Sequence, residues 1–214
     1  MRSLSVAAAI FAVVLSTKLI NSILAVPSPT EAEPQRRNPS ADFIRTSCKS
    51  TMYPMRCYRT LSPYASEIGS DPKKLAMKAL NVTLKVTKSA SKLMKRMSRI
   101  PGVPAALADC VEEVEDAVDE LGKSIGEMDR GPAQGPEFCR MIGDVQTWVS
   151  AAETDDDTCT DGFEEVPTVS PGVKRNVKKI VEKHVGRIAR FTSNALALVN
   201  LYASSSSRSR HVKC

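Results

Sequence analysis

The stretch that decides the fold runs from Ala106 to Phe163, with one half reading ALADCVEEVEDAVDELGKSIGEMDR (106–130) and the other EFCRMIGDVQTWVSAAETDDDTCTDGF (137–163). Apolar residues recur in each half at steps of three and four, which is the period of one helix face. The break GPAQGP (131–136) is short, so the two helices are predicted to be antiparallel neighbours. The predicted stripes are Leu107, Cys110, Val114, Ala117, Val118, Leu121 and Ile125, then Phe138, Met141, Val145, Trp148 and Ala152.

This hairpin favours one disulfide. Cys110 lies near the start of the first helix and Cys159 just beyond the end of the second, so the two ends meet. Cys139 lies at the opposite end, some 25 Å from Cys110 at about 1.5 Å per residue, whereas a bridge needs Cα atoms within about 7 Å. We therefore favour Cys110–Cys159 over Cys110–Cys139.

Two further long helices flank the hairpin. Asp71 and Pro72 carry the signals of a helix start, and Pro171-Gly172 precedes the last helix. Four long helices with short Pro/Gly breaks predict an all-α, up-down-up-down four-helix bundle over residues 71–203. The predicted core-facing stripes of these two helices are Leu75, Ala79, Val82, Val86, Leu93 and Met97 in the first, and Val177, Val181, His184, Ile188, Phe191, Ala195, Leu198 and Tyr202 in the last.

A smaller unit precedes the bundle at residues 42–66. Eight residues separate Cys48 from Cys57, and Pro54 breaks the helical pattern between them. A disulfide-closed helical hairpin fits this pattern. Metal binding is the alternative, but neither histidine is close, so we expect no metal site.

The two ends of the chain are predicted to lie outside the folded domain of residues 42–203. Residues 1–25 have the pattern of a secretory signal peptide, in which Lys18 makes the apolar run too short for a membrane anchor. The Pro-rich segment 26–41 is expected to be a disordered lead-in, and 204–214 a flexible tail. In a secreted chain, Asn81-Val82-Thr83 is a glycosylation sequon, with Asn81 off the buried stripe.

Charge restricts the function classes. The formal charge of +6 falls to +4 without Arg2 and Lys18, and no basic patch is interleaved with aromatics, so nucleic acid is not indicated. The outer face of the last helix is basic. A solvated face is the simpler interpretation; contact with anionic pectin is the alternative. This face comprises Lys174, Arg175, Lys178, Lys179, Lys183, Arg187 and Arg190.

No catalytic motif or cofactor signature is present. His184 falls on an apolar stripe and His211 in the tail, so neither is a predicted general base. The acidic stripe Glu112, Asp116 and Asp119 lies opposite the apolar face of its helix. Such a face is either solvated or a docking surface.

Three segments resemble the plant invertase/pectin methylesterase inhibitor family: FIRTSCKSTMYPMRCYRTLS, ALADCVEEVEDAVDEL and VQTWVSAAETDDDTCTDGF. The resemblance covers about Phe43 to Tyr202. It implies the Cys48–Cys57 bridge, the placement of the hairpin on the bundle, and a non-enzymatic inhibitor that covers its target's active-site cleft in a 1:1 complex. The interface positions of the pectin methylesterase branch correspond to Glu112, Asp116, Asp119 and, before the fourth family cysteine, Thr158.

The same resemblance implies the target and the location. Invertase inhibitors of the family carry a Pro-Lys-Phe motif, which this chain lacks, so pectin methylesterase in the cell wall (the apoplast) is the preferred target and acid invertase the alternative. A secreted helical module that binds a receptor or a lipid is the rival interpretation. Cys139 and Cys214 are additional to the four family cysteines; they pair with each other, stay free or link two chains.

Overall fold

The computed structural model describes residues 38–101, 103, 106–132, 134–161 and 171–209. The predicted signal peptide and most of the lead-in lie outside these residues. So do His211, Cys214 and segment 162–170. Within the described residues, the chain is helical and has no strand. None of their helices is long and apolar enough to cross a membrane.

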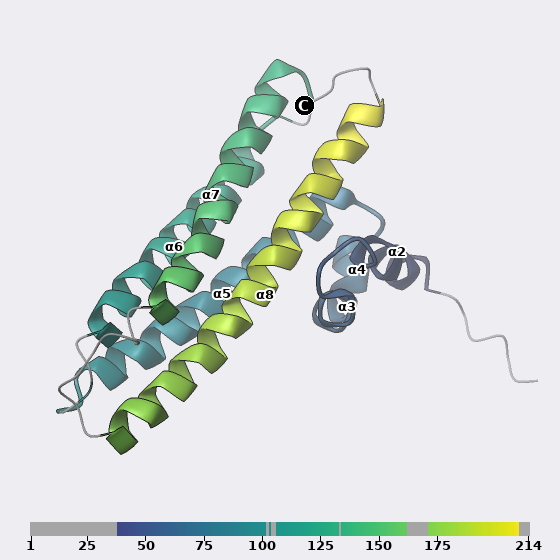
Figure 1. Ribbon diagram of the computed structural model, residues 1–214. Coiled ribbons are helices and arrows are strands. Elements are labelled where there is room, and N and C mark those ends of the chain that lie inside the picture. The colour runs from purple at the N-terminus through teal and green to yellow at the C-terminus, as the bar shows by residue number, and fades with distance from the viewer. Residues whose placement is uncertain (1–37, 102, 104–105, 133, 162–170, 210–214) are drawn as a thin grey trace, which may run out of the picture. The chain divides into compact units, whose positions relative to one another are not determined.

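Four long helices run side by side (Figure 1). They are α5 (Pro72–Ser98), α6 (Ala106–Arg130), α7 (Pro136–Asp161) and α8 (Pro171–Ser209). Each contacts the next along the chain, and α8 also contacts α5, which closes the bundle. The predicted four-helix bundle is confirmed.

Local signals explain where these helices begin. The Asp71 carboxylate accepts hydrogen bonds from the backbone N–H groups of Lys73 and Lys74, at 2.8 and 3.2 Å, and Pro72 occupies the first turn. These bonds satisfy donors that a helix start leaves unpaired. Pro136 and Pro171 likewise open α7 and α8.

The core differs from the predicted stripes at several positions. Trp148 and His184 are only half-buried, and their neighbours Val149 and Val185 are buried instead. On α5, Thr83 and Thr87 are fully buried, whereas Val82 is half-buried. Both threonine hydroxyls donate to backbone carbonyls one turn earlier, at 2.9 and 3.0 Å, so their burial leaves no polar group unpaired. On α5, the predicted buried face was therefore displaced from the observed one, because a polarity pattern does not register that a threonine hydroxyl can pair within its own helix.

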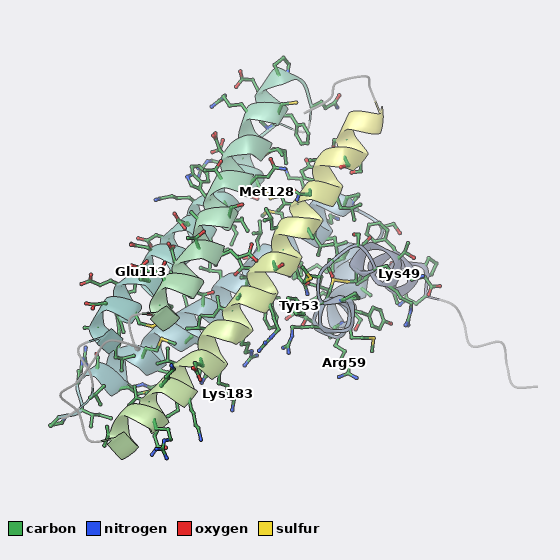
Figure 2. All side chains as sticks on the ribbon, in the orientation of Figure 1. Lys49, Tyr53, Arg59, Glu113, Met128 and Lys183 are labelled. Atoms are coloured by element: carbon green, nitrogen blue, oxygen red, sulfur yellow. A yellow bond between two sulfur atoms is a disulfide. The ribbon has the colours of Figure 1, made fainter. Side chains whose placement is uncertain are left out.

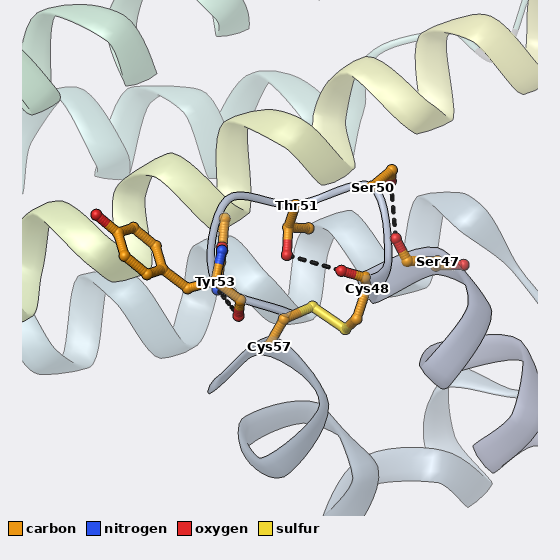
Figure 3. Close-up of a disulfide and its surroundings, with 7 residues drawn as sticks. Ser47, Cys48, Ser50, Thr51, Tyr53 and Cys57 are labelled. Carbon is orange, nitrogen blue, oxygen red and sulfur yellow. Dashed lines mark hydrogen bonds between the residues drawn. A yellow bond between two sulfur atoms is a disulfide. The ribbon is translucent and has the colours of Figure 1, made fainter. Parts of the chain in front are cut away.

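The N-terminal unit consists of α2 (Pro39–Cys48), α3 (Pro54–Leu61), the 3-10 turn η1 (Ser62–Tyr64) and α4 (Ala65–Ile68). A disulfide joins Cys48 to Cys57, with Cα atoms 5.6 Å apart. Between them, the Thr51 hydroxyl donates to the Cys48 carbonyl at 2.9 Å (Figure 3). The unit contacts α5 and α8, and its buried Ile44, Leu61 and Ile68 join one core cluster with Leu198.

Three predicted boundaries were wrong. Helix α2 begins at Pro39 inside the predicted lead-in, because the Asn38 side chain caps it by accepting from two backbone N–H groups. Helix α8 continues to Ser209 through the predicted tail, since Tyr202 is buried and the Ser204 hydroxyl donates to the Asn200 carbonyl. Helix α7 ends at Asp161, so Cys159 lies within it.

Candidate partner-binding surface

The predicted acidic stripe forms a ridge on α6. Glu112, Asp116 and Asp119 are all exposed. At about 100° per residue they fall within about 60° of one another and opposite the buried Val114 and Leu121. The helix therefore presents three carboxylates to solvent on its outermost face.

A disulfide holds one end of this ridge. Cys110 and Cys159 are bonded, with Cα atoms 4.2 Å apart, and both are buried. Glu112 follows Cys110 by two residues and Thr158 immediately precedes Cys159, so the bridge brings these two positions to the same end of the α6–α7 pair. Thr158 is exposed; its hydroxyl donates to the Thr154 carbonyl at 3.2 Å, and its oxygen can still accept a hydrogen bond.

Another side of α6, next to the ridge, faces α5. Glu115 forms an ion pair with Lys95 of α5, and both side chains remain partly exposed. This pair orients one carboxylate of α6 towards α5. It thus separates Glu115 from the solvent-facing ridge of Glu112, Asp116 and Asp119.

Sequence reasoning missed three carboxyl groups on the α7 side of α6. Glu113 and Glu120 of α6 and Asp155 of α7 are half-buried (Figure 2 labels Glu113). Burial, followed by the charge of Asp155 and a hydrogen bond with it, raises the pKa of Glu120 to about 7. Burial is likewise the main reason that the pKa of Asp155 is raised.

Glu120 and Asp155 therefore form a carboxyl pair that holds a proton at mildly acidic pH. One oxygen of each, Glu120 Oε2 and Asp155 Oδ2, is buried without a hydrogen-bond partner, so a second negative charge there lacks compensation. Burial also raises the pKa of Glu113, with further contributions from the charges of Asp155 and Asp116. The sequence did contain a signal: Glu113 and Glu120 are seven residues apart and border the apolar stripe.

The other predicted sites are the glycosylation sequon at Asn81 and the two additional cysteines, Cys139 and Cys214. Asn81 is exposed on α5, and its side-chain N–H donates to the Met77 carbonyl at 2.8 Å; its glycosylation stays a prediction. Cys139 is disulfide-bonded and belongs to neither bridge described above, while Cys214 lies outside the described residues. In the part of the chain that the structure describes, no group of three or more His, Cys, Asp or Glu residues could hold a metal ion.

Comparison with known proteins gives a family. Residues 42–198 match the family model described as "Plant invertase/pectin methylesterase inhibitor". Pectinesterase inhibitor 10 of Arabidopsis thaliana is 51% identical over 76% of this chain and 52% of its own length. This chain therefore spans about half the length of that relative.

Two other relatives match over nearly their whole length. The 21 kDa protein of Daucus carota is 40% identical over 88% of this chain and 95% of its own length. Pectinesterase inhibitor 11 of Arabidopsis thaliana is 37% identical over 91% of this chain and 95% of its own. The chain belongs to the plant invertase/pectin methylesterase inhibitor family.

Proposed function

We propose that this protein inhibits a pectin methylesterase by forming a 1:1 complex in which the α6–α7 face covers the enzyme's active-site cleft. The relatives named as pectinesterase inhibitors support the choice of target. The observation that carries the choice of surface is the exposed ridge of Glu112, Asp116 and Asp119 beside the exposed Thr158. The predicted signal peptide supports secretion and action in the plant cell wall.

The physical mechanism is steric occlusion by a rigid face. The Cys110–Cys159 bridge and the buried contacts between α6 and α7 fix the ridge before binding. A preorganised surface loses less conformational entropy on association than a mobile one. Inhibition then needs no chemistry from the inhibitor itself.

The ridge carboxylates contribute orientation and association rate. Exposed charges at an interface mainly steer the encounter with a partner of opposite charge, and they do so less at high salt. We therefore expect basic or hydrogen-bond-donating groups around the cleft of the target enzyme. Thr158, with an oxygen free to accept, would add a short-range contact.

The test is a titration of the oxidised, secreted protein into a pectin methylesterase assay and, in parallel, an acid invertase assay. Complete loss of methylesterase activity at one equivalent supports the proposal. Loss of invertase activity alone would replace the target, and no loss in either assay would reject inhibition of both.

A charge-matched pair of variants tests the surface. Asp116→Asn with Asp119→Asn should weaken inhibition about tenfold or more, which is about 1.4 kcal/mol. Glu127→Gln with Asp129→Asn removes the same charge at the far end of α6 and should change inhibition little. Equal loss in both variants would show that net charge, and not the ridge, determines binding.

A further inference from the structure

A second surface lies on other elements of the molecule. An open cleft of about 580 Å³ is formed by the loop and helix α3 of the N-terminal unit on one side and by α8 on the other. Figure 2 labels Tyr53 and Arg59 on the unit that borders α8. Its volume falls within the range of about 300–1,000 Å³ that is typical of ligand sites. The described residues that line it include none from α6 or α7.

The charge of this cleft has one sign. Among the residues that the structure describes, four arginines line it and no carboxylate does. They are Arg56 and Arg59 of α3 and Arg187 and Arg190 of α8. Among the described residues, none of the four forms an ion pair with a carboxylate. The Nε atom of Arg190 is buried and has no hydrogen-bond partner in the structure.

An aromatic ring lies between the two sets of arginines. The guanidinium carbons of Arg56 and Arg187 each lie 5.7 Å from the centre of the Phe191 ring. The ring is half-buried and lines the cleft together with Tyr53. Phe191 therefore links cations from two elements and helps hold them in place.

This composition fits a carboxylate carried on a sugar. Each cationic side chain among the described lining residues is an arginine, whose planar guanidinium can bind a carboxylate through two parallel hydrogen bonds. The rings of Tyr53 and Phe191 offer apolar surface for the C–H face of a sugar. We propose that the cleft binds an unesterified polyuronate, a polysaccharide with a free carboxylate on each sugar.

The choice of polyuronate over other anions rests on the proposed function. A pectin methylesterase removes methyl esters from pectin and so exposes uronate carboxylates. An inhibitor with a second, separate site for that product would be retained where the enzyme has already acted. The inference that the cleft binds an anion of some kind does not depend on the proposed function, because it follows from the four arginines that line the cleft.

Binding is tested with an oligomer of about ten galacturonate units and, as its uncharged match, the fully methyl-esterified oligomer. Titration calorimetry on the full secreted chain should detect the acidic oligomer and not the esterified one. Arg59→Gln with Arg187→Gln should weaken binding about tenfold or more, since each variant position removes a charge-assisted contact. Equal binding of both oligomers would overturn the proposal.

Lys179→Gln with Lys183→Gln is the matched control. Both lysines are exposed on α8 and neither lines the cleft, so the same loss of charge should weaken binding much less. Equal loss in the two variants would overturn the cleft in favour of a general basic face. Binding to phosphatidylserine vesicles without binding to the oligomer would also overturn it.

The two proposals fail separately. Arg59→Gln with Arg187→Gln should leave the inhibition of pectin methylesterase unchanged, because the α6–α7 ridge is untouched. Binding of the oligomer by a protein that inhibits nothing would keep the cleft and reject the proposed function. Inhibition without binding of the oligomer would reject the cleft alone.

Discussion

The side-chain amide of Asn194 on α8 pairs with both backbone polar groups of Tyr53 in the N-terminal unit. The Tyr53 N–H donates to Asn194 Oδ1 at 3.0 Å, and Asn194 Nδ2 donates to the Tyr53 carbonyl at 3.1 Å. Asn194 is only 5% exposed. One buried side chain thus anchors the disulfide-closed unit to the bundle across 141 residues of sequence.

Asn194→Ala should loosen this unit. The substitution leaves the Tyr53 N–H unpaired near the core, at a cost of about 1–3 kcal/mol, while the Tyr53 carbonyl keeps the hydrogen bond that it accepts from the Cys57 N–H at 3.0 Å. Amide hydrogen exchange in α2 and α3 should accelerate, while α6 and α7 change less. Asn200→Ala is the control: Asn200 lies on the same helix as Asn194, and its side-chain oxygen accepts only an exposed hydrogen bond from Gln146 of α7. Unchanged exchange in the N-terminal unit would show that the apolar contacts alone hold it.

The Glu120–Asp155 pair predicts a pH dependence of stability. The pKa of Glu120 is about 7 in the folded protein and near 4.3 in an unfolded chain. The folded state therefore binds more protons between these values. The resulting stabilisation is fully present below about pH 4.3 and is lost as the pH rises through about 7.

Thermal unfolding at about pH 5 and about pH 7.5 measures this effect. Glu120→Gln cannot ionise, so its melting temperature should fall less between these two pH values than that of the unmodified protein. Each 1 kcal/mol corresponds to about 2–4 °C for a domain of this size. Glu112→Gln removes an exposed carboxyl and serves as the control. The same fall in Glu120→Gln as in the unmodified protein would contradict the assignment.

The sequence predicted most of the fold because its strongest signals are local. Periodic apolar residues, the Asp71-Pro72 start and the GPAQGP break each act over one or two helical turns. The Cys110–Cys159 pair followed from the antiparallel arrangement that these signals imply. The ridge of Glu112, Asp116 and Asp119 is visible for the same reason, as it lies on one face of one helix.

The features that could not be predicted depend on contacts between distant segments. The burial of Glu120 requires Asp155 on another helix, and the arginine cleft combines Arg59 of α3 with Arg187 of α8. Thr83 is buried because its hydroxyl has a local acceptor, which a hydropathy pattern does not register. Neither the partner of a side chain nor its desolvation can be obtained from the spacing of residues along one helix.

The two disulfides should differ in their effect on stability. On the loop-entropy model, the loop closed by Cys110–Cys159 contributes about 4 kcal/mol and the shorter loop of Cys48–Cys57 about 3 kcal/mol. Cys110→Ala with Cys159→Ala should therefore lower the melting temperature more than Cys48→Ala with Cys57→Ala. The first pair should also weaken inhibition, because it frees the end of the ridge, and the second should not. The reverse order for inhibition would place the binding surface on the N-terminal unit.

Two glycines, Gly122 inside α6 and Gly131 just after its end, should respond to alanine with opposite signs. A Cβ at Gly131 would lie 2.7 Å from Met141 Cγ and 2.8 Å from the backbone carbonyl oxygen of Glu127, whereas a Cβ at Gly122 meets nothing within 4 Å. Gly131→Ala should thus destabilise the α6–α7 turn by about 1–3 kcal/mol. Gly122→Ala should stabilise the exposed helix by up to about 1 kcal/mol, because alanine has the higher helix propensity. Denaturant unfolding measures both, and a loss of stability in both variants would contradict the open environment of Gly122.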